Sequence, residues 1–223
     1  LTAAKRPAIL AGSRVTERDA VAELVRVAEL LGAPVMHESG TTHGRLAFPT
    51  DHPLSALGMP LWSHEVQQRL APHDVVLAVG MDVLRQYIHH EPAQAIPEHV
   101  QLVQLDEDPW QLGKNYPVAV DLFGDTKVGL AGLAKLIAVS QTESQQAEAK
   151  TRFDRLAGEH ASAQEALRQQ INQQSDIRPL TPLTFMNALA RVLPDDIAVV
   201  EEAVTPTAPT LERLVRIKLT TGY

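Results

Sequence analysis

Two aspartates, Asp106 and Asp108, come directly after the apolar stretch 100–105 (VQLVQL), and Pro109 follows them. An acidic side chain at the carboxyl end of a strand can hold a ribose hydroxyl in a dinucleotide-binding fold. Asp before Pro is also ordinary turn chemistry, in which the carboxylates cap the loop that leaves the strand. The residues favour the loop-capping interpretation and leave ribose binding as the alternative.

Histidines are concentrated in the first half of the chain, and they raise the question of a metal site. His89, His90 and Glu91 are consecutive, but adjacent residues on a helix or strand do not share a face. The sequence contains neither HExxH nor HxH. The pattern therefore favours surface or loop histidines over metal ligands, and the set comprises His37, His43, His52, His64, His73, His89 and His90.

The common signatures of nucleotide binding and hydrolysis are absent from the sequence. There is no GxGxxG, no GxxxxGK[ST] and no GxSxG, and the turn AGSRV (residues 11–15) has one glycine where a dinucleotide turn has two or three. The chain has no cysteine, which excludes disulfides, thiolate zinc sites and cysteine nucleophiles. These motifs predict no catalytic set in the first part of the chain.

A second candidate site follows the apolar stretch 197–200 (IAVV), which is expected to be a strand. The turn behind it carries Glu201, Glu202 and Thr205, and a helical pattern begins after the turn. In open α/β sheets ligands bind at the carboxyl ends of strands. The alternative is that these side chains only cap the next helix, for which Thr207 followed by Pro209 is a good start.

The elements that must position these residues alternate between apolar strands and amphipathic helices. Helices are expected over residues 21–31, where Gly32 closes the helix, and over 126–139, where Asp125 can cap the first turn. A capping box is expected at Thr16 and Asp19. Such alternation predicts an α/β fold, a Rossmann-like parallel sheet with helices on both faces. The expected strands are 7–11, 34–36, 74–79, 100–105 and 118–122.

The composition changes after residue 140, which predicts a division into three parts. Residues 1–140 form the Rossmann-like domain. Residues 141–177, rich in Gln, Glu, Ala and Arg, form a mostly solvated helical linker. Residues 178–223 begin a second, partial α/β unit with a helix that starts at Thr181 and Pro182.

Composition and charge exclude several classes of protein. A net charge of −7 without a Lys/Arg run argues against nucleic-acid binding. No apolar run approaches the length of a membrane span. Aromatic residues make up only 4%, so the core must be aliphatic. The absence of cysteine fits a reducing compartment, and we expect a cytoplasmic protein.

Three stretches in order along the chain carry a family resemblance. HGRLAFPTDHP (43–53), QLDEDPWQLGKNYPVAVDLFGDTKVGLAGL (104–133) and PLTPLTFMNALARVLPDDIAVVEEAVT (179–205) resemble the thiamine-diphosphate-dependent decarboxylase and acetolactate synthase superfamily. The first two are similar to its middle domain and the third to the start of its diphosphate-binding domain. The FPTDHP loop favours the benzoylformate decarboxylase branch.

The resemblance implies a fragment of a longer enzyme, inactive by itself. Family members have three domains and hold thiamine diphosphate through Mg²⁺ with a GDG motif and a following Asn, which this sequence lacks. The activating Glu belongs to the first domain, so no catalytic residue is expected here. The resemblance implies that Glu202, Val204 and Thr205 lie in the turn that contacts the diphosphate.

The same resemblance implies a 2-keto acid decarboxylase that is a homotetramer when full-length. One alternative is an acetolactate-synthase-like carboligase with FAD in the middle domain. The other is a stand-alone nucleotide-binding or structural module that holds FAD or ADP. We expect no cofactor in this fragment itself, and in the whole enzyme thiamine diphosphate and Mg²⁺ with a small 2-keto acid as substrate.

Overall fold

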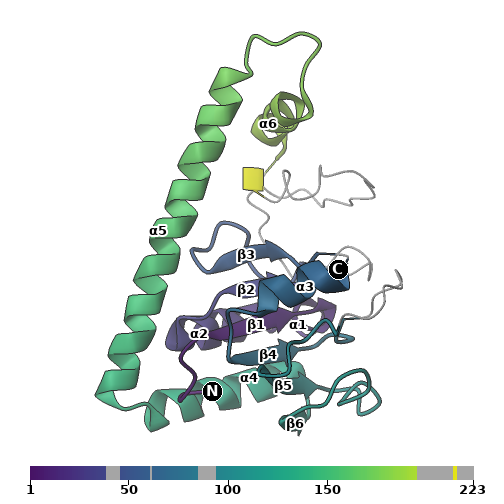
Figure 1. The fold of residues 1–223 in the computed structure, drawn as a ribbon, viewed down its shortest axis with the longest axis vertical. Coiled ribbons are helices and arrows are strands. Elements are labelled where there is room, and N and C mark those ends of the chain that lie inside the picture. Colours follow the sequence, from purple (N-terminus) through teal and green to yellow (C-terminus); the bar gives the residue numbers. More distant parts are fainter. Residues whose placement is uncertain (39–45, 61, 85–93, 195–212, 215–223) are drawn as a thin grey trace.

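The computed structural model describes residues 1–38, 46–60, 62–84, 94–194 and 213–214. Its centre is a parallel sheet of six strands in the order β3-β2-β1-β4-β5-β6, which confirms the predicted α/β class (Figure 1). The strands are β1 (Pro7–Ala11), β2 (Val35–His37), β3 (Ser55–Gly58), β4 (Val75–Val79), β5 (Gln101–Asp106) and β6 (Val120–Phe123). This is the order of a doubly wound dinucleotide-binding fold, and it reverses between β1 and β4.

Both faces of the sheet are covered, because alternate residues of each strand point to opposite sides. Ile9 and Leu77 pack in one cluster with α2 (Val21–Leu31) and α4 (Thr126–Ser140), through side chains such as Leu24 and Leu130. Leu10 and its neighbours pack in a second cluster with α3 (Ser63–Leu70). The aliphatic core predicted from the composition is therefore present on each side of the sheet.

The helix end predicted at Gly32 and the helix cap predicted at Asp125 are confirmed. Gly32 ends α2 in the left-handed conformation, and the Asp125 side chain accepts a hydrogen bond from the Val128 amide at 2.9 Å at the start of α4. The capping box expected at Thr16 and Asp19 is wrong. Thr16 lies inside the short helix α1 (Ser13–Glu17), and its hydroxyl donates to the Leu46 carbonyl at 2.5 Å instead.

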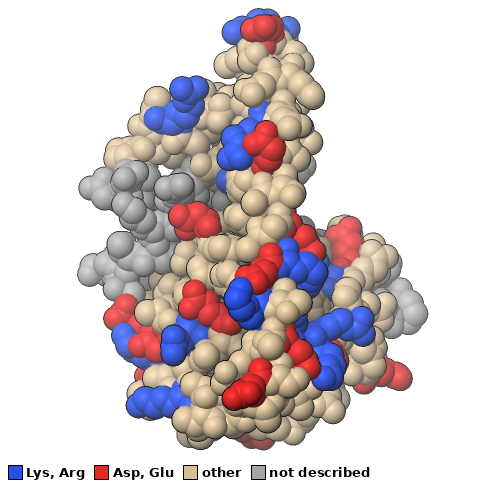
Figure 2. All heavy atoms as spheres, turned by 90° about the vertical axis from the view of Figure 1, so that its left-hand side faces the viewer, with Lys and Arg blue, Asp and Glu red and all other residues tan. Residues whose placement is uncertain are grey.

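A single 31-residue helix, α5 (Glu143–Gln173), occupies most of the segment expected to be a helical linker. It begins at a capping box formed by Thr142 and Gln145, and it runs along one side of the sheet domain to α6 (Pro182–Val192) (Figure 1). Acidic and basic side chains are interspersed on the face of the molecule that α5 dominates (Figure 2). Pairs such as Arg155–Glu159 and Arg168–Glu165, at 2.6 and 2.8 Å, support an exposed helix at these spacings.

One turn of α5 is fixed to the sheet domain. The Arg152 guanidinium donates to the Leu31 carbonyl at 2.8 Å, at the end of α2. The His52 ring lies 5.0 Å from the Phe48 ring and 6.5 Å from the Phe153 ring, centroid to centroid and edge to face.

The division into three parts stays a prediction, and the expected strand 197–200 lies outside the described residues.

Candidate functional site at the carboxyl end of the sheet

The carboxyl ends of β1 and β4 meet at the point where the strand order reverses. The Gly12 amide donates to the Val79 carbonyl at 2.9 Å, and the Arg14 amide donates to the Gly80 carbonyl at 3.1 Å. A Cβ at position 12 would lie 2.3 Å from the Met81 Cβ and 2.5 Å from the Gly80 carbonyl oxygen. The two chain segments therefore approach so closely that only glycine fits at position 12.

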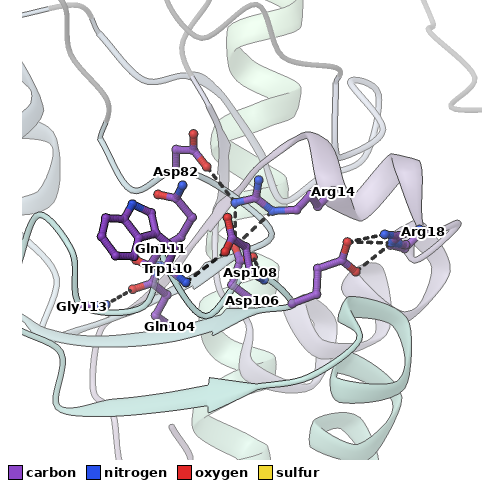
Figure 3. Close-up of polar contacts among 10 residues, drawn as sticks. Arg14, Arg18, Asp82, Gln104, Asp106, Asp108, Trp110, Gln111 and Gly113 are labelled. Atoms are coloured by element: carbon purple, nitrogen blue, oxygen red, sulfur yellow. Dashed lines mark hydrogen bonds and ion pairs between the residues drawn. The ribbon is translucent and has the colours of Figure 1, made fainter.

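Three charged side chains from three different segments converge on this junction. The Arg14 guanidinium donates to Asp82 behind β4 at 2.9 Å and to Asp106 at the end of β5 at 2.9 Å (Figure 3). The Asp106 side chain is fully buried, whereas the side chains of Arg14 and Asp82 are 21% and 24% exposed. We call these three residues the switch-point triad.

The triad is charged. Burial of the guanidinium acts to lower the pKa of Arg14, but the hydrogen bonds and charges of Asp106 and Asp82 outweigh burial and raise it above its ordinary value. A cation that is held by two carboxylates cannot take up or release a proton near neutral pH. The Arg14 guanidinium therefore supplies no general acid or base, and its ion pairs with Asp82 and Asp106 act as a cross-link between segments.

The position of Asp106 decides between the two interpretations of the sequence. One carboxylate oxygen accepts from Arg14, and the other accepts from the Asp108 amide at 2.9 Å. The Asp108 carboxylate in turn accepts from the Trp110 amide at 3.0 Å. Both aspartates thus cap the loop that leaves β5, as the favoured interpretation predicts, and the Asp106 oxygens are already engaged.

The loop behind β5 is attached to the sheet by buried polar contacts. The Gln104 side chain donates to the Gln111 carbonyl at 2.9 Å and accepts from the Gly113 amide at 3.0 Å (Figure 3). Beside the loop, the Arg18 guanidinium holds both carboxylate oxygens of Glu107, with Nε–O distances of 2.9 and 2.7 Å. The Trp110 side chain stays 73% exposed on this loop.

Sequence reasoning missed the triad, because Arg14 and Asp82 lie 92 and 24 residues away from Asp106 in the chain and belong to no motif. A signal was present in the turn after the first strand. Arg14 stands in AGSRV at the position where a dinucleotide-binding turn keeps its backbone open for a pyrophosphate.

The other predicted site residues fall into two groups. Glu202, Val204 and Thr205 lie outside the described residues, so their contact with the diphosphate stays a prediction. Among the described histidines, the His52 Nδ1 accepts from the Leu54 amide at 3.1 Å and the His73 Nδ1 lies 3.1 Å from the Arg6 carbonyl oxygen. In the described part of the chain, no group of three or more His, Cys, Asp or Glu side chains could hold a metal ion.

The sequence also predicts that no segment of the chain is long and apolar enough to span a membrane. Within the described ranges, no helix has both the length and the apolar character that crossing a membrane requires.

Comparison with known proteins gives the class to which this fold belongs. Residues 1–133 match the family described as thiamine pyrophosphate enzyme, central domain. The match covers more than half of the 223 residues, so the chain belongs to the thiamine pyrophosphate enzymes and contains their central domain. The family resemblance found in the sequence is confirmed.

Individual relatives have several different activities. The chain is 33% identical over 176 residues to a sulfoacetaldehyde acetyltransferase of Alcaligenes xylosoxydans xylosoxydans, which covers 75% of this chain and 27% of the relative. It is 35% identical over 139 residues to a probable acetolactate synthase large subunit of Methanocaldococcus jannaschii, covering 60% of this chain and 22% of the relative.

The fold is shared with solved structures of the same class. The crystal structure of benzoylformate decarboxylase from Polynucleobacter necessarius superposes with a TM-score of 0.73 at 26% identity, covering 97% of this chain and 36% of the other. The chain thus spans about a quarter of the length of the curated relatives and just over a third of the solved structure.

Proposed function

We propose that the whole protein to which this chain belongs is a thiamine-diphosphate-dependent decarboxylase of a 2-keto acid, similar to benzoylformate decarboxylase. The chain would contribute the central domain, a connecting helix and the start of the diphosphate-binding domain. The likeness to benzoylformate decarboxylase extends over 97% of the chain, including the part behind the family match.

The switch-point triad is the observation that favours this proposal over the flavin-dependent alternative. In a doubly wound fold the pyrophosphate of a dinucleotide lies at the junction of β1 and β4. There it would meet the carboxylates of Asp82 and Asp106, which carry charge of the same sign, or it would have to separate Arg14 from them. The residues at this junction do not fit FAD or ADP, and we propose a central domain that holds neither.

Thiamine diphosphate, when bound, supplies the electron sink for loss of carbon dioxide from a 2-keto acid. Within this chain, Thr205 and the neighbouring Glu202 and Val204 are proposed to lie against the diphosphate. Mg²⁺, which prefers oxygen ligands, is proposed for the same site of the whole enzyme. The residues of the switch-point triad would act as a scaffold, because they are joined by their own ion pairs.

A carboligase or acyltransferase is the second candidate, and it is favoured by two of the curated relatives. Sulfoacetaldehyde acetyltransferase and acetolactate synthase share a third of their aligned residues with this chain. Both candidates begin with thiamine-diphosphate chemistry, so the products must discriminate between them.

The experiment is a product analysis of the whole protein with thiamine diphosphate, Mg²⁺ and benzoylformate. The proposal predicts release of carbon dioxide with an equal amount of the corresponding aldehyde. Consumption of sulfoacetaldehyde in preference to any 2-keto acid, or formation of acetolactate from pyruvate, would support the second candidate. The sequence-based expectations of a homotetramer, a cytoplasmic location and no nucleic-acid partner belong to the same proposal.

A further inference from the structure

A cavity of about 280 Å³ lies between the β3 edge of the sheet domain and the long helix α5. Residues 53–57 around β3 form one wall, and the α5 residues between Leu156 and Leu167 form the other. Arg69 of α3 and Arg213 also line the cavity. The Gln164 side chain on α5 donates to the Arg213 carbonyl at 3.4 Å, which joins this residue to the same wall.

The lining has positive charge that the described residues do not neutralise. The Arg69 guanidinium donates to the Ala56 carbonyl, and within the described ranges it makes no ion pair with a carboxylate. Burial lowers the pKa of Arg69, and the nearby charge of Arg213 lowers it further, yet a guanidinium remains charged at neutral pH. Two like charges thus face one cavity.

One acidic side chain also lines the cavity, but it is engaged elsewhere. The Glu159 carboxylate accepts from the Arg155 guanidinium at 2.6 Å, one turn earlier on α5. His160, the next residue, can donate a ring N–H to an anion. The side chains of Arg69, Arg213 and His160 thus line the cavity with a single carboxylate, that of Glu159, among the described lining residues.

The remaining walls are mostly apolar, with Thr50, Ser55 and Gln164 as their polar side chains, and the apolar residues include Pro34, Pro53, Leu54, Leu156 and Leu167. An apolar enclosure with a few convergent polar groups is typical of small-molecule sites. A fully hydrated inorganic anion would leave these walls uncovered, whereas a carboxylate on an apolar body matches both parts. A guanidinium also presents paired donors that match the two oxygens of a carboxylate.

We infer that this cavity binds a small carboxylate with an apolar body, with its oxygens held by Arg69 and Arg213 and its body against the leucines of α5 and β3. Because the site joins α3, the β3 edge and α5, an occupant would connect the long helix to the sheet domain. The inference is independent of which reaction the whole protein performs.

The test uses 4-bromobenzoate with the whole protein, and its neutral amide, 4-bromobenzamide, as the matched control. Bromine anomalous scattering in a soaked crystal is expected to place the acid in this cavity. Calorimetry is expected to give a dissociation constant on the order of 1 mM for the acid, because a ligand of about ten non-hydrogen atoms gains only a limited binding free energy. The amide is expected to bind roughly tenfold more weakly.

Variants distinguish this site from any other carboxylate site in the protein. Arg69→Gln removes the charge but keeps a side-chain N–H donor in place of the one that the Ala56 carbonyl accepts, and Arg213→Gln removes the second charge without touching α3. Each should weaken binding of the acid about tenfold, while Arg168→Gln, an exposed α5 residue paired with Glu165, should not. Absence of bromine density in the cavity, equal affinity for acid and amide, or unchanged affinity in both variants would overturn the assignment.

Discussion

The Arg14 guanidinium donates to the fully buried carboxylate of Asp106 at 2.9 Å, across 92 residues of sequence. This contact joins the turn behind β1 to the end of β5, and it lies at the switch point of the strand order, where a doubly wound fold ordinarily takes its ligand. It is the structural reason for proposing a central domain without a nucleotide.

Replacing Asp106 by Asn should destabilise the protein by about 2–3 kcal/mol, because it removes the buried partner of a cation while keeping an oxygen for the Asp108 amide. Asp82→Asn should cost less, since Asp82 is partly exposed and Asp106 would still hold Arg14. The free energy of unfolding in denaturant measures both. An equal or larger loss for Asp82→Asn would contradict the leading role of Asp106.

Gly12→Ala should destabilise the fold by about 1–3 kcal/mol, because the new Cβ would meet the Met81 Cβ at 2.3 Å and a backbone oxygen at 2.5 Å. Gly158→Ala is the matched control in α5, where an added Cβ meets nothing within 4 Å. It should stabilise the helix by about 0.5–1 kcal/mol. Chemical denaturation of both variants checks the pair, and tolerance of alanine at position 12 would show that β1 and β4 can separate.

The class of fold could be predicted because β1 and β4 are continuous apolar runs, as strands covered on both faces are, and because β5 is buried from its second residue to its last despite Gln104 and Asp106. β3 and α3 were missed. The β3 sequence SALG has no apolar run, and α3 is mostly polar, with Val66 and Leu70 as its buried apolar residues. The triad could not be predicted, since its members share no motif and meet only when the strand order reverses.

Lowering the pH should weaken the fold through His52. Burial lowers the pKa of His52 more than the nearby Glu29 raises it, so the folded state favours the neutral ring. The unfolded chain then binds more protons than the folded chain between the lowered value and the ordinary value of 6.5. The free energy of unfolding should therefore fall as the pH drops through about 6.5 and below.

His52→Asn tests this dependence, because its side-chain oxygen can still accept from the Leu54 amide that now donates to Nδ1. The variant should show a shallower loss of stability between pH 7 and pH 5 than the parent, measured by thermal or denaturant unfolding. Burial also lowers the pKa of His73, so His73 should account for part of the pH dependence of stability that persists in this variant. An unaltered slope in His52→Asn would exclude His52 as a source.

Thr205→Ala in the whole protein should raise the apparent Kd for thiamine diphosphate by about tenfold, the loss expected when one hydrogen bond to a charged group is removed. Thr207→Ala is the control, because Thr207 is expected only to cap the helix behind the turn. Titration of the cofactor-free protein with thiamine diphosphate and Mg²⁺ measures both. An unchanged Kd for Thr205→Ala would remove this residue from the proposed site.

The most direct test of the account is the cofactor content of the whole protein, purified with thiamine diphosphate and Mg²⁺ present. After denaturation, chromatography of the released small molecules should find thiamine diphosphate in an amount equal to the protein chains, with no FAD and no ADP. Stoichiometric FAD or ADP would contradict the claim that the switch-point triad closes the central domain to nucleotides, and absence of thiamine diphosphate would contradict the proposed enzyme.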